Sequence, residues 1–213
     1  MLSGFRNVLV LSPHTDDGEL GAGGTIAKLT EAGANVHYAA FSTAEESVPV
    51  GLPRDILKTE VRAATKQLDI PEDNIFIYNY RVRKLNYSRQ EVLEDLVTLR
   101  SKTNYDLVLV PSLSDVHQDH STVAQEALRA FKATTILSYE LIWNNLNFNT
   151  ACFVVLDKAN VEKKIAALAE YKSQSGRAYM SAEFILSLAK ARGVQIGAPY
   201  AEAFEVVRWV MRS

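Results

Sequence analysis

The chain has 213 residues, and at roughly 150 residues per domain this length favours one domain spanning residues 1–213. Hydrophobic residues make up 47% of the chain and charged residues 23%, a globular composition that excludes disordered and fibrous proteins. The formal net charge of −2 argues against nucleic-acid binding. No apolar run approaches the ~20 residues of a membrane span, and the lone Cys152 fits a reducing compartment. We therefore expect a soluble, cytoplasmic protein with no nucleic-acid or membrane partner.

The apolar pattern alternates short strands with longer helices along most of the chain. The expected strands are residues 8–11, 36–41, 75–80, 107–110, 136–139, 151–156 and 204–210. The expected helices are residues 25–32, 56–68, 90–99, 123–131, 161–171 and 182–191. This alternation predicts parallel βαβ units and an α/β fold. We expect a Rossmann-like, doubly wound and mostly parallel sheet in three layers, with a C-terminal appendix of helices and strand.

Two polar clusters directly follow the first and the fourth expected strands. The first reads Ser12-Pro-His-Thr-Asp-Asp-Gly-Glu19, and the second reads Ser114-Asp-Val-His-Gln-Asp-His120. Because these two strands are commonly neighbours in doubly wound sheets, we expect the clusters to face each other across one crevice. Three of the four histidines of the chain lie in these two clusters. The fourth, His37, falls inside the second strand and is interpreted as a packing residue.

The mixture of histidine and aspartate in the clusters suits a divalent ion such as Zn²⁺. Imidazole nitrogens and carboxylate oxygens both bind zinc, and three protein ligands leave one position open for water. The candidate ligands are His14, Asp17 and His120. Three side chains then remain for proton transfer, namely Asp16, His117 and Asp119. A metal-activated water next to a carboxylate base is typical of a hydrolase.

Other interpretations of these stretches have less support. An Asp16-Asp17 pair alone is also typical of a helix N-cap. The glycine-rich stretch 18–24 departs from the dinucleotide fingerprint G-x-G-x-x-G, because Ile26 stands where the last glycine is required. No G-x-S-x-G elbow occurs, so a serine hydrolase has no motif to support it. Cys152 is interpreted as a core thiol.

At these residues the sequence resembles the LmbE-like (PIG-L) family of zinc-dependent N-acetylglucosaminyl deacetylases. His14-Thr-Asp-Asp17 and Leu20-Gly-Ala-Gly-Gly24 match its first motif, and His117-Gln-Asp-His120 matches its second, His-x-Asp-His. A softer match, Tyr200-Ala-Glu-Ala-Phe204, lies near the C-terminus. Thr15 and Gln118 replace prolines that are frequent in the family, but neither change removes a ligand or a proton carrier.

The resemblance implies a role for each residue of the two motifs. One zinc ion per chain is expected on His14, Asp17 and His120. Asp16 is expected to act as the general base for the zinc-bound water. His117 is expected to be the cation that stabilises the oxyanion and helps to protonate the leaving amine, with Asp119 orienting it. Tyr200 is expected to border the carbonyl pocket, and Arg54 to contact the substrate.

The resemblance also implies the reaction, which is removal of the N-acetyl group from an N-acetylglucosamine-type sugar or its conjugate. The products are acetate and a free amine, the partner is a small molecule, and the family suggests a homo-oligomer. Candidate walls of the substrate crevice also include Trp143, Asn144 and Asn145, although the asparagines are equally typical of turns. Two alternatives remain open, a hydrolase of a different N-acyl or amide substrate, and a non-catalytic Rossmann-like module that binds a metal or ligand.

Overall fold

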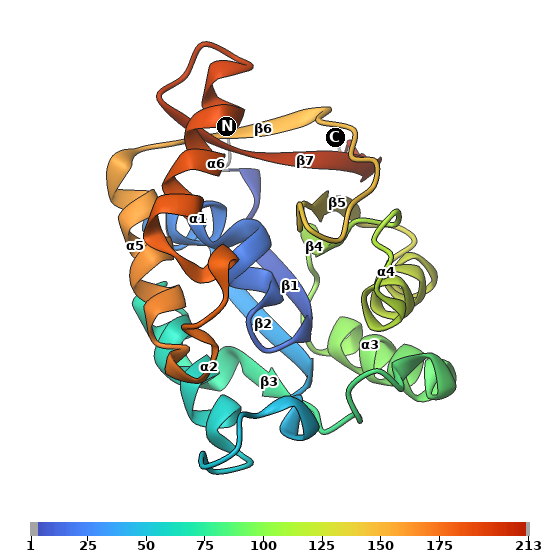
Figure 1. Cartoon of the computed structure of the whole chain (residues 1–213). Helices are drawn as coiled ribbons and strands as arrows, with labels where there is room; N and C mark the ends of the chain where they lie inside the picture. The colour runs from blue at the N-terminus through green and yellow to red at the C-terminus, as the bar shows by residue number, and fades with distance from the viewer. Residues whose placement is uncertain (1–3, 212–213) are drawn as a thin grey trace.

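A computed structural model describes residues 4–211 and shows a seven-stranded sheet flanked by helices (Figure 1). The strand order is β3-β2-β1-β4-β5-β7-β6. The strands are β1 (Asn7–His14), β2 (Asn35–Ser42), β3 (Ile75–Ile77), β4 (Leu107–Pro111), β5 (Thr135–Tyr139), β6 (Cys152–Leu156) and β7 (Tyr200–Arg208). Strands β1 to β5 pair in parallel, whereas β7 runs antiparallel to both β5 and β6. The expected doubly wound, mostly parallel α/β sheet is confirmed.

Helices cover both faces of this sheet. One side carries α1 (Asp17–Glu31), α2 (Ile56–Gln67), α5 (Lys158–Ala169) and α6 (Ala182–Val194), and the other carries α3 (Arg89–Lys102) and α4 (Gln118–Ala130) (Figure 1). Along β1, Val8 and Val10 join the core under the first group, and Leu9 and Leu11 join the core under the second. Because both faces are buried, the strand is apolar throughout and does not alternate with polar residues.

The C-terminal helices and strands, expected as an appendix, extend the same sheet at its β5 end. β7 lies between β5 and β6, while α5 packs on α1 and α2, and α6 packs on α5 and β7 (Figure 1). The stretch from Lys172 to Ser181 between the two helices is therefore held close to the carboxyl end of β1. None of the helices among residues 4–211 is long and apolar enough to cross a membrane.

Helices α1 and α4 both begin earlier than the sequence pattern predicted. α1 starts at Asp17 rather than residue 25, because glycines with low helix propensity dilute its first two turns. These glycines permit close packing, since an added Cβ would lie 2.6 Å from the Tyr38 hydroxyl at Gly18 and 2.1 Å from Tyr139 Cδ2 at Gly21. The early starts place Asp17 and His120 in the first turns of their helices.

Candidate active site

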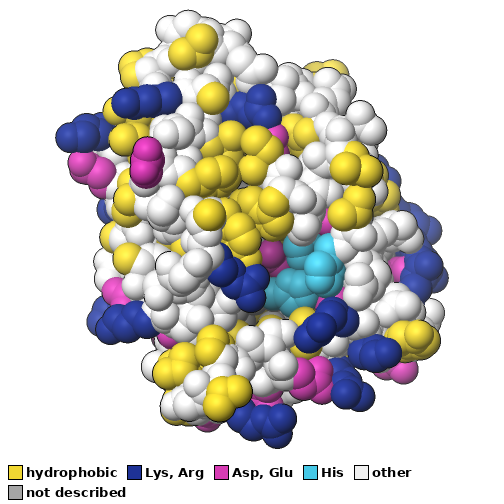
Figure 2. All heavy atoms as spheres, in the orientation of Figure 1, with side chains coloured by type: hydrophobic (Ala, Val, Ile, Leu, Met, Phe, Trp, Pro, Cys, Tyr) yellow, Lys and Arg dark blue, Asp and Glu magenta, His cyan; other side chains and the backbone are white. Residues whose placement is uncertain are grey.

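The two polar clusters meet in one cavity at the carboxyl ends of β1 and β4. The two strands are parallel neighbours, as the sequence predicted. The cavity has a volume of about 330 Å³, and Figure 2 shows the histidines exposed at its floor. Its lining includes the site residues His14, Asp16, Asp17, His117 and His120, together with Ser47, Leu57, Arg83, Trp143, Asn144, Arg177 and Tyr179. We call this space the histidine cavity.

Three side-chain atoms in the histidine cavity have the spacing of ligands around one small ion. His14 Nδ1 lies 3.1 Å from Asp17 Oδ2, and His120 Nε2 lies 3.2 Å from the same oxygen. The two imidazole nitrogens are 3.2 Å apart. Ligand bonds of roughly 2.0–2.2 Å at a tetrahedral angle place neighbouring donors roughly 3.3–3.6 Å apart. His14, Asp17 and His120 therefore fit a zinc ion with little rearrangement.

A second grouping of donors overlaps the first. His14, His117 and His120 can each offer a ligand atom such that all three atoms lie within 4.8 Å of one another. In this set His117 takes the place of Asp17. Its Nδ1 accepts a hydrogen bond from the backbone N–H of Asp119 at 3.2 Å, which leaves Nε2 for other partners. The set containing Asp17 is tighter and supplies a negative charge to offset that of a cation.

Each histidine of the tighter set is oriented by a buried carboxylate. Asp119 Oδ2 lies 3.0 Å from His14 Nε2, and Asp115 Oδ2 lies 2.7 Å from His120 Nδ1. Such pairs fix the imidazole tautomer and orientation, and they make the other nitrogen a better metal ligand. Asp115 lies in the same polar cluster as His117 and His120, and no motif indicates this role for it. Asp119 was expected to orient His117, but its carboxylate contacts His14, and only its backbone N–H contacts His117.

We expect Asp115→Ala to weaken zinc binding by roughly 10- to 100-fold, because His120 loses the partner that fixes its ring. The measurement is a zinc titration of metal-free protein against a chromophoric chelator. Asp106→Ala is the matched control, since that carboxylate caps Arg6 and Asn7 far from the cavity. Equal zinc affinity in Asp115→Ala and the control would show that Asp115 has no part in the site.

Asp16 is a half-buried carboxylate that faces the cavity. It occupies the N-cap position of α1, yet its side chain makes no capping hydrogen bond, so a capping role does not explain it. Burial, followed by the neighbouring charge of Asp17, raises the pKa of Asp16 to about 6. A carboxylate that gains and loses a proton near neutral pH is suited to general acid–base catalysis.

His117 differs from the expected cation. Burial, followed by repulsion from the positive charges of His120 and His14, lowers the pKa of His117 to about 4. Because Nδ1 accepts a backbone hydrogen bond, the neutral ring carries its proton at Nε2. The arrangement thus offers a neutral N–H donor toward the cavity rather than a permanent positive charge.

Two of the expected substrate residues do not line the histidine cavity. Arg54 is exposed and borders a separate hollow beside Glu45 and Glu46, and α2 presents Leu57 to the cavity instead. Tyr200 begins β7 and pairs with Leu156 of β6. The structure therefore does not bring Arg54 or Tyr200 to the other site residues.

The residues that follow β5 form one wall of the histidine cavity, and two of the three wall residues predicted there line it. Trp143 and Asn144 line the cavity, whereas Asn145 acts as a turn former whose Oδ1 accepts the N–H of Leu141 at 2.8 Å. The stretch between α5 and α6 contributes Arg177 and Tyr179, which no motif indicated. The Tyr179 ring stacks on Trp143 with centroids 4.0 Å apart and planes 10° apart.

A buried network supports the loop that carries His14 and Asp17. The carboxyl group of Glu19 is fully buried and contacts the hydroxyls of Tyr38 and Tyr171. The same hydroxyls lie 2.9 Å and 2.6 Å from the carbonyl oxygen of Thr15. Burial raises the pKa of Glu19 to about 8, so the carboxyl group is protonated at neutral pH.

The Glu19 network should make the stability of the metal-free protein depend on pH. A carboxyl group whose pKa rises from 4.5 to about 8 on folding contributes stability that is full below pH 4.5 and is lost as the pH rises through 8. Glu19→Gln keeps the shape and removes the titration. The difference in unfolding free energy between wild type and Glu19→Gln should therefore change across this range, by at most roughly 1.4 kcal/mol for each pH unit. Urea unfolding at several pH values measures it, and a constant difference would contradict the assignment.

Comparison with known proteins places the chain among deacetylases. Residues 9–131 match the family model described as "PIG-L: GlcNAc-PI de-N-acetylase". YaiS of Escherichia coli K12, described as an uncharacterized deacetylase, is 26% identical over 172 residues, covering 79% of this chain and 91% of that protein. The conserved protein TT1542 of Thermus thermophilus has a similar structure with a TM-score of 0.82 at 24% identity, covering 97% of this chain and 96% of its own. The N,N'-diacetylchitobiose deacetylase of Pyrococcus horikoshii matches with a TM-score of 0.76 at 21% identity, covering 95% and 84%.

Proposed function

This chain belongs to the PIG-L family of deacetylases, and from that premise we propose that it removes the N-acetyl group of an N-acetylglucosamine-type sugar or its conjugate. The products are acetate and the free amine. The observation that carries the proposal is the close triangle of His14, Asp17 and His120 with the free carboxylate of Asp16 beside it. We propose one zinc ion per chain as the cofactor.

Three residues would hold the ion, namely His14, Asp17 and His120. When bound, a zinc ion supplies Lewis acidity, which lowers the pKa of a water and polarises the acetyl carbonyl. Asp119 and Asp115 hold the two imidazole rings in place from behind.

The proton transfers are assigned to the residues that line the cavity. Asp16 accepts a proton from the attacking water while the new C–O bond forms at the acetyl carbon. The Nε2–H of His117 donates to the carbonyl oxygen as negative charge develops on it. Cleavage of the C–N bond then releases acetate, and the amine nitrogen takes the proton back from Asp16. One residue with a pKa near 6 can serve in both steps.

The cavity wall supports a sugar as the substrate. The volume of the histidine cavity, about 330 Å³, is within the range of small-molecule sites. The stacked pair of Trp143 and Tyr179 offers an aromatic face of the kind that packs on a pyranose ring, and the side chains of Asn144 and Ser47 offer polar groups for hydroxyls. An acetylated lysine peptide lacks the hydroxyls that these groups would bind.

The experiment measures acetate release by zinc-loaded protein from N-acetylglucosamine, its methyl glycoside and diacetylchitobiose, beside an acetyl-lysine peptide. We expect turnover of a sugar, loss of turnover with a chelator, and recovery when zinc is restored. A preference for the peptide would favour a different amide substrate. Zinc binding without turnover of any substrate would favour the non-catalytic alternative.

A further inference from the structure

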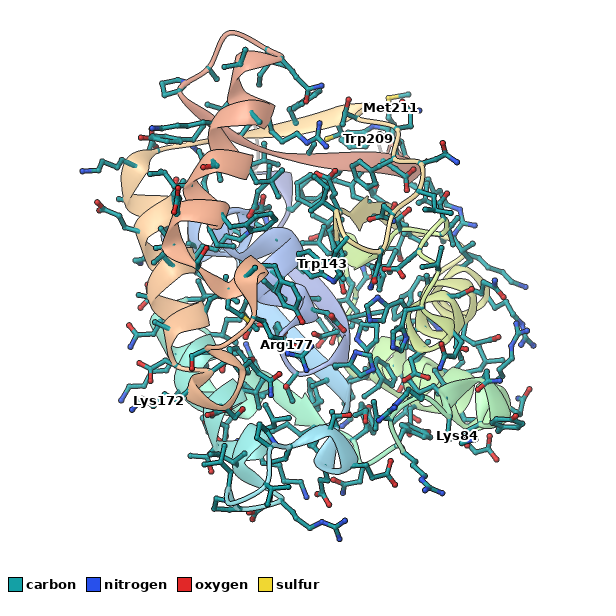
Figure 3. The ribbon with its side chains drawn as sticks, viewed as in Figure 1. Lys84, Trp143, Lys172, Arg177, Trp209 and Met211 are labelled. Atoms are coloured by element: carbon teal, nitrogen blue, oxygen red, sulfur yellow. The ribbon has the colours of Figure 1, made fainter. Side chains whose placement is uncertain are left out.

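Two arginines stand on the rim of the histidine cavity. Arg83 precedes η4 (Leu85–Tyr87), and Arg177 lies in the stretch between α5 and α6. Figure 2 shows basic side chains on both sides of the exposed histidines, and Figure 3 shows Arg177 below Trp143. Both side chains are exposed to solvent. A group held over the histidines can therefore meet a guanidinium on either side.

Arg83 is placed on the rim by its own strained backbone. Its φ of 63° lies in the left-handed region, which is unfavourable for a residue with a Cβ. The backbone N–H donates to Asp119 Oδ2, the oxygen that also contacts His14. Strain of this kind persists only where surrounding contacts impose it, and it is concentrated at functional sites. The conformation ties the position of the Arg83 side chain to the carboxylate that orients a metal ligand.

Arg177 is attached to the aromatic wall of the cavity. Its guanidinium carbon lies 5.8 Å from the centre of the Tyr179 ring, and Nη1 donates to the Tyr179 hydroxyl. Tyr179 in turn stacks on Trp143. This wall is the one proposed above to pack on the sugar ring. The positive charge of Arg177 therefore lies next to the expected position of the substituents on that ring.

Neither rim arginine has a carboxylate partner among residues 4–211. Arg83 donates to the hydroxyl of Ser47 at 3.2 Å, and Arg177 donates to a phenol. Some other arginines do have such a partner, since Arg81 pairs with Glu46 and Arg192 pairs with Glu140. Within the described part of the chain, the two arginines that line the cavity thus keep their guanidinium groups free of any carboxylate ion pair. A guanidinium presents a planar fork of donors that matches a carboxylate or a phosphate.

We propose that the substrate is an acetylated amino sugar bearing an anionic group, a phosphate or a carboxylate, which Arg83 and Arg177 bind. This inference rests on the proposed deacetylation and adds the charge of the substrate to it. The arginines are assigned to binding, because neither guanidinium makes a hydrogen bond or ion pair with Asp16 or His117. Their main effect is expected in KM, although the charge of Arg177 also acts on Asp16 and lowers its pKa.

The test compares three substrates that differ only in the group on the anomeric oxygen. They are methyl N-acetylglucosaminide, carboxymethyl N-acetylglucosaminide and N-acetylglucosamine 1-phosphate. We expect wild type to favour at least one anionic substrate over the methyl glycoside by about tenfold or more in kcat/KM, and this preference to shrink at high salt. Arg83→Ala and Arg177→Ala should each lose most of the preference through a higher KM, with zinc content unchanged. Arg177→Lys should recover part of it.

Arg81→Ala is the matched control, because its exposed guanidinium lies near Arg83 in sequence but pairs with Glu46 outside the histidine cavity. It should keep the wild-type preference. Equal turnover of all three sugars, or a preference that survives in both rim variants, would overturn the inference while the deacetylation stands. Failure to release acetate from any of them, with activity on an acetyl-lysine peptide, would overturn the proposed function and this inference with it.

Discussion

Replacing Asp16 by asparagine is expected to lower kcat by roughly 10²- to 10⁴-fold, because the amide cannot accept the proton of the attacking water. The shape of the site should be unchanged, since the Asp16 side chain makes no capping hydrogen bond that the substitution would break. Zinc content should therefore stay at the wild-type level. The wild-type rate should also fall in acid as Asp16, with its pKa of about 6, becomes protonated. Steady-state kinetics from pH 5 to pH 9 on metal-quantified protein give all three quantities.

Asp73→Asn provides the comparison for this substitution, because Asp73 is an exposed aspartate in η3 (Glu72–Asn74), away from the cavity. Its rate and pH profile should match those of wild type. An Asp16→Asn protein with near-normal kcat would rule out Asp16 as the general base. Asp119 would then be the remaining carboxylate candidate for that role. A loss of zinc in Asp16→Asn would indicate that Asp16 acts on the metal rather than on the proton.

Replacing His120 by alanine is expected to remove most of the zinc and with it essentially all activity. The substitution deletes one corner of the ligand triangle, and Asp115 and Asp17 lose the ring that they both contact. His14→Ala should have the same effect through the second corner, which protects the test if one variant folds poorly. Elemental analysis, with circular dichroism as the check on folding, measures the outcome.

His37→Ala is the control for the metal measurement, because His37 is the one histidine of the chain outside the two clusters. As the sequence predicted, it is a buried packing residue, and its Nδ1 lies 2.7 Å from the Tyr105 hydroxyl. Zinc should stay at about one ion per chain in this variant. Unchanged zinc in both His120→Ala and His14→Ala would refute the ligand assignment.

The fold was predictable because each buried strand leaves a local signal. Continuous apolar runs such as residues 8–11 and 107–110 mark strands that are covered on both faces. In the helices between the strands, apolar residues recur every three or four positions. The pairing of β1 with β4 then followed from the topology of doubly wound sheets and brought the two polar clusters together. Helix starts were harder, because the glycines that let α1 pack on Tyr38 and Tyr139 also weaken its helical pattern.

The periphery of the site was not predictable from local pattern. Arg177 and Tyr179 reach the cavity because α5 packs on α1, a contact between segments far apart in sequence, and α6 packs on α5. Arg83 depends on a left-handed backbone that no residue preference indicates. The family resemblance predicted Arg54 and Tyr200 near the substrate, but neither residue lines the histidine cavity. α2 presents Leu57 to it instead, and Tyr200 pairs with Leu156 of β6.

Anomalous X-ray diffraction from crystals of zinc-loaded protein tests the ligand assignment most directly. We expect one zinc ion per chain with bonds of roughly 2.0–2.2 Å to His14 Nδ1, Asp17 Oδ2 and His120 Nε2, and with Asp16 and His117 outside the bonding distance. An ion bound by the three imidazoles of His14, His117 and His120 without Asp17 would contradict this assignment, as would a zinc site elsewhere on the chain.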